Sequence, residues 1–208
     1  MILPQLKTRT RVQHEQAEAS LDLMNPHLTR ERYVQVLRRM WTLYVPLEDR
    51  LGTLLGPAGR AALDWPARLK RPLLERDLRD LRSPLPDAPG GAGDRLEFLQ
   101  AEADAWGAAY VLEGATLGGQ LLRRHLGTQL DLGAGGAAFY SSYGELVGPR
   151  WKAFGAALEA RGAADADPAA FAERAVQSAG QTFGLFISGL PVPEVLPALR
   201  HGQAGGTL

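Results

Sequence analysis

The sequence predicts an all-α fold. Apolar residues recur at intervals of three and four along most of the 208-residue chain, which is the spacing of one helix face. We find no convincing run that alternates apolar and polar residues, and no hairpin dipeptide between β-branched stretches. Prolines and capping residues stand where helices would begin. We therefore expect a single helical domain over residues 1–200, followed by a frayed tail over residues 201–208.

Three helices are expected in the first half of the chain. The first runs from about Pro4 to Ser20, with the proline in its first turn. The second covers "NPHLTRERYVQVLRRMWTLYVPLEDRLGTLL", where Thr29 is the expected N-cap and Pro46 is expected to introduce a kink. The third, "KRPLLERDLRDLR", ends at "SPLPDAPGGAGD", a loop rich in proline and glycine. This loop is too short to require a domain boundary.

Three more helices follow. One spans about Leu96 to His125. The next covers "GAGGAAFYSSYGELVGPRWKAFGAALEARG" and is expected to be interrupted near Gly148 and Pro149. The last covers "DPAAFAERAVQSAGQTFGLFISGL", with Asp167 as its cap and a proline at its first position.

Composition limits the classes of function. Lys+Arg and Asp+Glu both number 23, and this zero net charge argues against a nucleic-acid-binding protein. The chain has no cysteine, which excludes disulfides, thiolate catalysis and cysteine-ligated zinc or iron–sulfur sites. The N-terminal stretch "MILPQLKTRTRVQHEQAE" is too charged for a signal peptide, and no apolar run approaches the length of a membrane span. We expect a cytoplasmic protein with no membrane or nucleic-acid partner.

The first helix places a histidine on its apolar face. The residues that share this face by their spacing are Leu6, Thr10, His14, Ala17 and Leu21. A core histidine that is hydrogen-bonded to a neighbour would explain His14, and so would a ligand to a metal. Glu18 lies one turn later, where it can approach Nδ1 and leave Nε2 free.

The basic residues near His14 fit either a solvated basic face or the site of an anionic ligand. Lys7 precedes His14 by two helical turns, about 10 Å along the axis, where it could pair with a carboxylate of a ligand centred over the histidine. Arg11 adds positive charge nearby. A di-iron carboxylate bundle is a weak alternative, because the sequence contains no Glu-x-x-His motif.

The segment "YVLEGATLGGQLLRRHL" has helical spacing but contains three glycines, each of which costs a helix roughly 0.5–1 kcal/mol relative to alanine. Gly107, Gly114 and Gly118 fall on one stripe, and Gly119 and Ala115 flank it. Close packing of two helices would explain such a bare face. So would a flat, bulky ligand that rests against the backbone, and the spacing alone does not choose between them.

Taken together, "LKTRTRVQHEQAE" and "YVLEGATLGGQLL" resemble the proximal and distal helices of haem oxygenases. The wording is most similar to that of the bacterial haem oxygenases associated with bacteriophytochromes. The resemblance implies a fold in which haem is held between these two helices. It implies that His14 is the neutral axial ligand, oriented by Glu18, and that Lys7 pairs with a haem propionate. It also assigns residues to the distal face, which are Gly114, Gly118 and Gly119, and to a second propionate site, which are Arg150 and then Tyr143.

The same resemblance implies an activity. Haem b would be both cofactor and substrate, and the enzyme would use O₂ and electrons from a ferredoxin or an NAD(P)H-dependent reductase to produce biliverdin, CO and Fe²⁺. Gly114 and Gly118 would steer the bound O₂, and the biliverdin would supply a bacteriophytochrome.

One departure from the family pattern affects the expected mechanism. Many haem oxygenases carry an aspartate directly after the first distal glycine, where this chain has Ala115. A non-catalytic haem carrier or sensor of the same fold is therefore an alternative, and a haem-free helical enzyme or scaffold is a third hypothesis. The other histidines, which are His27, His125 and His201, are expected in surface or loop positions.

Overall fold

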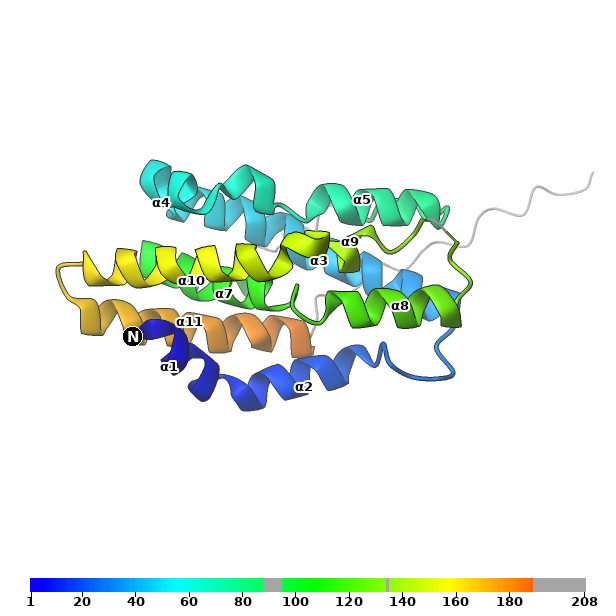
Figure 1. The fold of residues 1–208 in the computed structure, drawn as a ribbon, viewed down its shortest axis with the longest axis horizontal. Helices are drawn as coiled ribbons and strands as arrows, with labels where there is room; N and C mark the ends of the chain where they lie inside the picture. The colour runs from blue at the N-terminus through cyan, green and yellow to red at the C-terminus, as the bar shows by residue number, and fades with distance from the viewer. Residues whose placement is uncertain (88–94, 134, 189–208) are drawn as a thin grey trace, which may run out of the picture.

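The computed structural model describes residues 1–87, 95–133 and 135–188, and every regular element in these ranges is helical (Figure 1). The all-α prediction is confirmed. None of the helices in these ranges is long and apolar enough to cross a membrane. The elements of the first half are α1 (Ile2–Arg9), α2 (Arg11–Leu21), α3 (Arg30–Leu54), α4 (Gly56–Leu63), the 3₁₀ helix η1 (Trp65–Arg68) and α5 (Arg71–Asp80).

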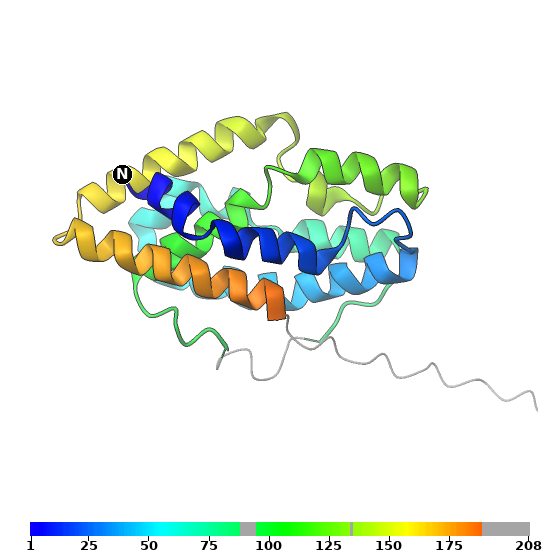
Figure 2. The ribbon, with the colours of Figure 1, turned by 90° about the horizontal axis from the view of Figure 1, so that it is seen from below.

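The prediction of one continuous first helix is wrong. Thr10 ends α1 with φ −109° and ψ 9°, and α2 starts at the next residue. The Thr10 hydroxyl donates to the Leu6 carbonyl at 2.8 Å, a bond back to the preceding turn that bends helices. Figure 2 shows that α1 and α2 meet at an angle. The axial separation expected between Lys7 and His14 on a straight helix therefore does not apply.

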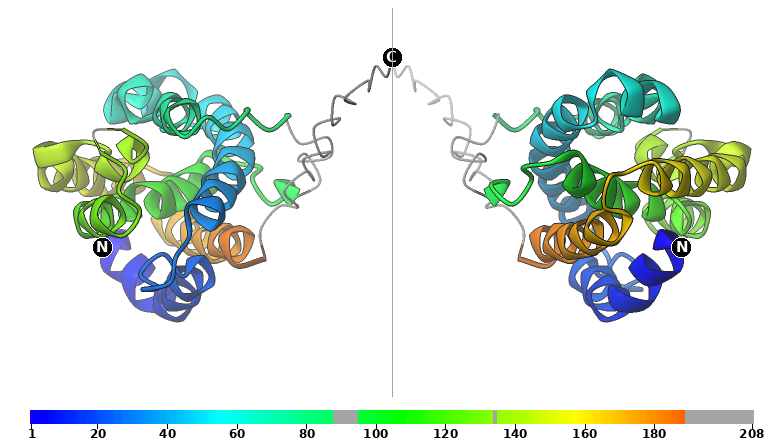
Figure 3. Two further views of the ribbon diagram at one scale, coloured as in Figure 1. Left: turned by 90° about the vertical axis from the view of Figure 1, so that its right-hand side faces the viewer. Right: turned by 90° about the vertical axis from the view of Figure 1, so that its left-hand side faces the viewer.

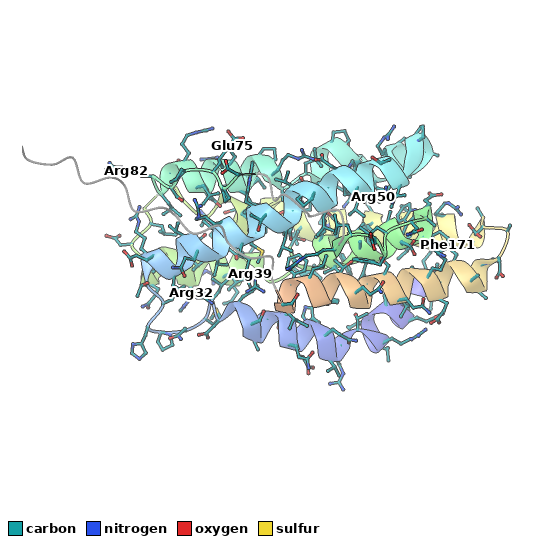
Figure 4. The ribbon with its side chains drawn as sticks, turned by 180° about the vertical axis from the view of Figure 1, so that it is seen from behind. Arg32, Arg39, Arg50, Glu75, Arg82 and Phe171 are labelled. Atoms are coloured by element: carbon teal, nitrogen blue, oxygen red, sulfur yellow. The ribbon has the colours of Figure 1, made fainter. Side chains whose placement is uncertain are left out.

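The predictions for the long second helix are confirmed at its start. The Thr29 side chain accepts a hydrogen bond from the Arg32 amide at 3.2 Å, and α3 then runs through Pro46 to Leu54. On the back of the molecule, shown in Figure 4, Arg39 extends from α3 and donates to the Ile187 and Phe186 carbonyls. A cation on these carbonyls caps the end of the last helix.

The helix predicted from Leu96 to His125 is two helices. The first, α7 (Glu102–Gly114), begins where the Asp104 carboxylate accepts from the amides of Gln100 and Ala101. The second is α8 (Gly119–Gln129). Between them the chain passes through successive turns with bonds between residues three apart. Residues 114–119 are called the glycine segment below.

The next interruption occurs earlier than predicted. After α9 (Ala138–Ser141), Ser142 and Gly144 have positive φ angles of 42° and 57°, and a 3₁₀ turn, η2 (Gly144–Leu146), leads into α10 (Val147–Ala163). Gly148 and Pro149 lie inside the first turn of α10, where a proline needs no amide donor. The prediction for the last helix, α11 (Pro168–Ser188), is confirmed, because the Asp167 carboxylate accepts from the Ala170 amide at 3.0 Å. Residues 201–208 and His201 lie outside the described residues.

Helix α7 forms the centre of the core, as the end-on views of Figure 3 show. Its most extensive packing is against α11. A Cβ atom at Gly107 would lie 2.0 Å from the Ala175 carbonyl oxygen of α11. At this position the glycine is explained by close contact between two helix backbones.

Replacing Gly107 with alanine is therefore expected to destabilise the fold. The added methyl group would push α7 away from α11, at a cost of about 1–3 kcal/mol in the free energy of unfolding. Gly127 of α8 is a matched control, since a Cβ atom there would meet nothing within 4 Å in residues 1–87, 95–133 and 135–188. Denaturant unfolding should show that Gly107→Ala lowers stability and that Gly127→Ala does not. Equal stabilities would contradict the packing role.

Candidate functional site

The residues that flank α2 form hydrogen bonds with α7 and α8, the two helices on either side of the glycine segment. Near its start, Thr10 forms a side-chain hydrogen bond with Tyr110 of α7; this bond opposes the rise in the pKa of Tyr110 that its burial causes. Beyond its end, the Pro26 carbonyl accepts from the Gln129 side chain of α8 at 2.6 Å. In Figure 1, α2 and the segment from α7 to α8 run toward the same end of the molecule.

Between these two hydrogen bonds, α2 and α8 pack mainly against other helices. The main partner of α2 is α11, and that of α8 is α9. His14 lies one helical turn after Thr10, and Gly114 lies four residues after Tyr110. The two regions predicted to hold a ligand therefore start from one junction and lie on the same side of the fold.

His14 is the exposed member of a stripe whose other members are buried or, at Leu21, half-buried. Thr10 and Ala17 are 2% and 7% exposed, whereas the His14 side chain is 48% exposed. Its ring packs edge-on against Phe183 of α11, with 5.7 Å between the ring centroids. The Glu18 carboxylate lies 3.6 Å from Nε2, not beside Nδ1 as predicted, and this distance is too long for a hydrogen bond. The imidazole is therefore accessible to a ligand.

The glycines have different roles. A Cβ atom at Gly119 would lie 2.2 Å from the Tyr140 carbonyl of α9, so this glycine allows close packing. A Cβ atom at Gly114 would contact the Trp151 ring at an ordinary 3.8 Å, and one at Gly118 would meet no described residue within 4 Å. Leu117 and Leu121, beside Gly118, are 50% and 63% exposed. The open part of the glycine segment is thus apolar and centred on Gly118.

The predicted cationic residues are only partly free. Lys7 is exposed on α1, and Arg11 pairs along α2 with Glu15 at 3.4 Å. Arg150 of α10 pairs with Asp64 at 3.1 Å.

Lys152 of α10 is a further cation, and no motif in the sequence indicates it. It is exposed, and it lies three residues before Gly155, where a Cβ atom would be 3.0 Å from Leu3 of α1. It also lies seven residues before Glu159, which accepts from the Ile2 and Leu3 amides. This spacing places Lys152 on the face of α10 that meets α1.

Tyr143 belongs to a buried polar cluster. Its hydroxyl donates to Glu113 Oε1 at 2.6 Å and accepts from Lys70 Nζ at 2.5 Å. Arg68 donates to the other oxygen of Glu113. The side chains of Arg68, Lys70 and Glu113 are each 3% exposed. A carboxylate in the otherwise apolar stretch "AWGAAYVLEG" was the signal in the sequence that could have indicated this cluster.

Burial changes the protonation of this cluster. It lowers the pKa of Lys70 to about 8, although the nearby carboxylates of Glu113 and Glu48 oppose the change. Burial raises the pKa of Tyr143, and Glu113 raises it further. Tyr143 therefore keeps its proton at neutral pH, while Lys70 titrates close to neutrality.

Lys70 should make stability depend on pH. Below about pH 8 both folded and unfolded chains carry the charged lysine, and the folded protein bears the full cost of burying it. Between about pH 8 and 10.5 only the unfolded chain stays protonated, so stability rises with pH. Relative to Lys70→Met, we expect the unmodified protein to gain about 3 kcal/mol across this range. Denaturant unfolding at several pH values measures the difference, and a constant difference would contradict the assignment.

The comparisons with known proteins agree on one family. The profile of the family described as Heme oxygenase matches residues 2–190. A heme oxygenase from Xanthomonas campestris pv. campestris (strain 8004) is 34% identical over 140 residues, which is 65% of this chain and 76% of that protein.

Solved structures share the fold. Heme oxygenase-1 from Synechocystis sp. PCC6803, in complex with heme, has a TM-score of 0.71 at 19% identity over 90% of this chain and 89% of that one. Heme oxygenase from Leptospira interrogans has a TM-score of 0.71 at 20% identity, over 90% of this chain and 100% of that one. At these identities the structures support the fold alone. The family match over nearly the whole chain establishes more: this protein belongs to the heme oxygenase family.

Proposed function

We propose that this protein cleaves haem b with O₂ and an external reductant and releases biliverdin, CO and Fe²⁺. The observation that carries the proposal is the accessible His14 imidazole on α2, whose flanking residues Thr10 and Pro26 bond to Tyr110 and Gln129 on either side of the open, apolar Gly118 region. Membership of the family supports a haem-degrading oxidoreductase.

The residues present fit haem. A neutral imidazole is a common protein ligand of haem iron, and among the described residues no group of three or more His, Cys, Asp or Glu side chains could hold a metal. Leu117 and Leu121 expose apolar surface beside Gly118, which suits the face of a porphyrin. When bound, haem supplies the redox chemistry with O₂.

The chain's own contribution is binding, orientation and enclosure. His14 would bind the iron from α2, with Glu18 near the ring to favour one orientation. The bare backbone at Gly118 would leave room for a small molecule on the opposite face while its apolar neighbours exclude water. Lys7 and Lys152, on neighbouring faces of α1 and α10, would pair with the two propionates and set the rotation of the ring.

Lys7→Ala and Lys152→Ala should each weaken hemin binding by about 10-fold or change the ratio of biliverdin isomers, because each removes one charge-assisted contact. Arg150→Ala tests the residue that the resemblance assigned to the second propionate. If Lys152 makes this contact, Arg150→Ala will leave affinity and isomer ratio unchanged. Unchanged values for Lys7→Ala or Lys152→Ala, measured by absorption titration and product chromatography, would contradict that lysine's role.

A haem carrier or sensor is the second candidate, and Ala115 is the observation that favours it. Hemin-loaded protein supplied with a reductase, NADPH and O₂ separates the two functions. An enzyme will lose the Soret band while biliverdin absorption grows and CO is released. A carrier will keep a stable oxygenated spectrum without any bilin. No change in the hemin spectrum on adding protein would contradict both candidates.

Further roles rest on the resemblance alone. The "YVLEGATLGG" wording supports a bacterial, cytoplasmic protein that passes biliverdin to a bacteriophytochrome. A ferredoxin or an NAD(P)H-dependent reductase would supply the electrons. Reconstitution of the apo-phytochrome with the turnover product, followed by its red and far-red spectra, tests the first of these roles.

A further inference from the structure

Both ends of the glycine segment lie next to the buried polar cluster that contains Tyr143 and Glu113. Glu113 directly precedes it on α7. At its other end, Gly119 packs against the Tyr140 carbonyl, three residues before Tyr143. The hydrogen bond between Tyr143 and Glu113 thus links the two sides of the segment.

Three members of this cluster form a directional chain of hydrogen bonds. Lys70 Nζ donates to the Tyr143 oxygen at 2.5 Å, and the Tyr143 hydroxyl donates to Glu113 Oε1 at 2.6 Å. Lys70 Nζ also lies 3.7 Å from that carboxylate oxygen. A proton can therefore pass from the lysine to the carboxylate through the phenol without rearrangement of the chain.

The charges around this chain come from several elements. Arg68 of η1 donates to Glu113, and its carbonyl accepts from Lys70 Nζ at 2.8 Å. Glu48 of α3 accepts from the Lys70 amide and pairs with Arg71 at 3.1 Å. Arg150 lies 5.4 Å from the Tyr143 ring and acts on the pKa of Tyr143. The pKa of the buried Tyr44 is in turn raised by its burial and by the nearby cluster. The two carboxylates, Glu48 and Glu113, thus lie among four cations, which are Arg68, Lys70, Arg71 and Arg150.

We propose that Lys70, Tyr143 and Glu113 form a proton relay that serves the glycine segment in a chain whose distal position holds Ala115. The proposal rests on the proposed function. In one step the Lys70 ammonium gives its proton to the Tyr143 oxygen, while the Tyr143 hydroxyl proton passes to Glu113. The products are a neutral amine and a neutral carboxyl, and the total charge is unchanged. Glu113 then releases its proton to water beside the glycine segment, and Lys70 takes up a proton from solvent.

Two properties of the cluster agree with this direction. The pKa of Lys70, which burial lowers to about 8, makes its ammonium a proton donor close to neutrality. Tyr143 has a raised pKa and stays protonated, as a bridging group must. An arginine at position 70 could hold Tyr143 but could not release a proton, so Lys70→Arg separates proton transfer from support of the fold.

The relay can be tested first without haem. The chain contains only three lysines, Lys7, Lys70 and Lys152, so lysine-selective NMR resolves each titration. We expect Lys70 to titrate near pH 8 and to shift lower in Tyr143→Phe, because the ammonium loses an acceptor. The matched control is Tyr140→Phe, since the buried Tyr140 hydroxyl has no hydrogen-bond partner among the described residues. A Lys70 titration at the ordinary lysine pKa of 10.5 would overturn the relay.

Turnover of the hemin-loaded protein tests delivery. In the unmodified protein the rate should fall as Lys70 loses its proton near pH 8. Tyr143→Phe and Lys70→Arg should lower the rate by about 100-fold at pH 7 and abolish this pH dependence, and Lys70→Arg should leave hemin affinity unchanged. Identical pH profiles in the unmodified protein and Tyr143→Phe would overturn delivery. If the unmodified protein does not turn over, the proposed function and delivery both fail, and the NMR titration still decides whether the relay exists.

Discussion

Replacing His14 by alanine is expected to remove the axial ligand of haem iron and to abolish biliverdin formation. The imidazole is the accessible nitrogen donor between the Thr10–Tyr110 and Pro26–Gln129 connections, and its side chain is 48% exposed. The substitution removes a surface side chain, so the fold should be unaffected. Absorption spectra of the ferric protein should lose the features of histidine ligation, and added imidazole should restore them.

His125 is the matched control for this result. It lies on α8, and within the part of the chain that the structure describes its buried Nε2 has no hydrogen-bond partner, which makes it a competing ligand candidate. His125→Ala should retain the spectrum and the turnover of the unmodified protein. The assignment of His14 would be refuted if His14→Ala kept the histidine-ligated spectrum, and still more clearly if His125→Ala lost it.

Gly118→Leu is expected to lower turnover by about 100-fold or more while the protein stays folded. The position is exposed and open, so a leucine side chain fits the fold but occupies the space proposed for O₂. Gly127→Leu provides the control, because its surroundings on α8 are equally open. Circular dichroism should show folded protein for both variants, and a single-turnover assay should show a loss for Gly118→Leu alone. Normal turnover in Gly118→Leu would contradict the proposed distal face.

Local signals in the sequence were sufficient for much of the fold. The capping residues Thr29 and Asp167 act within a few residues of their helices, and both form the expected bonds. The breaks between successive helices were harder to predict from the sequence. Thr10 bonds back to Leu6 at the place where α1 and α2 diverge, and the glycine segment separates α7 from α8. The Thr10 bond is local but does not alter the apolar spacing, and the second break depends on packing, since Gly119 meets the Tyr140 carbonyl of α9.

The candidate site was likewise only partly predictable from the sequence. The resemblance indicated His14 and Gly118, and the structure makes both accessible. The sequence could not separate Gly118 from Gly107 and Gly119, since all three follow helical spacing and only packing partners distinguish them. The cluster of Lys70, Glu113 and Tyr143 joins residues up to 73 positions apart, so no local pattern contains it.

The structure of the hemin-loaded protein, determined by crystallography, tests the account most directly. We predict iron bound to a nitrogen of His14, the Gly118 backbone on the opposite face, and the propionates beside Lys7 and Lys152. Iron bound to His125, or hemin in the groove lined by Pro46, Arg50 and Gln100 on the outer side of α3, would contradict the account.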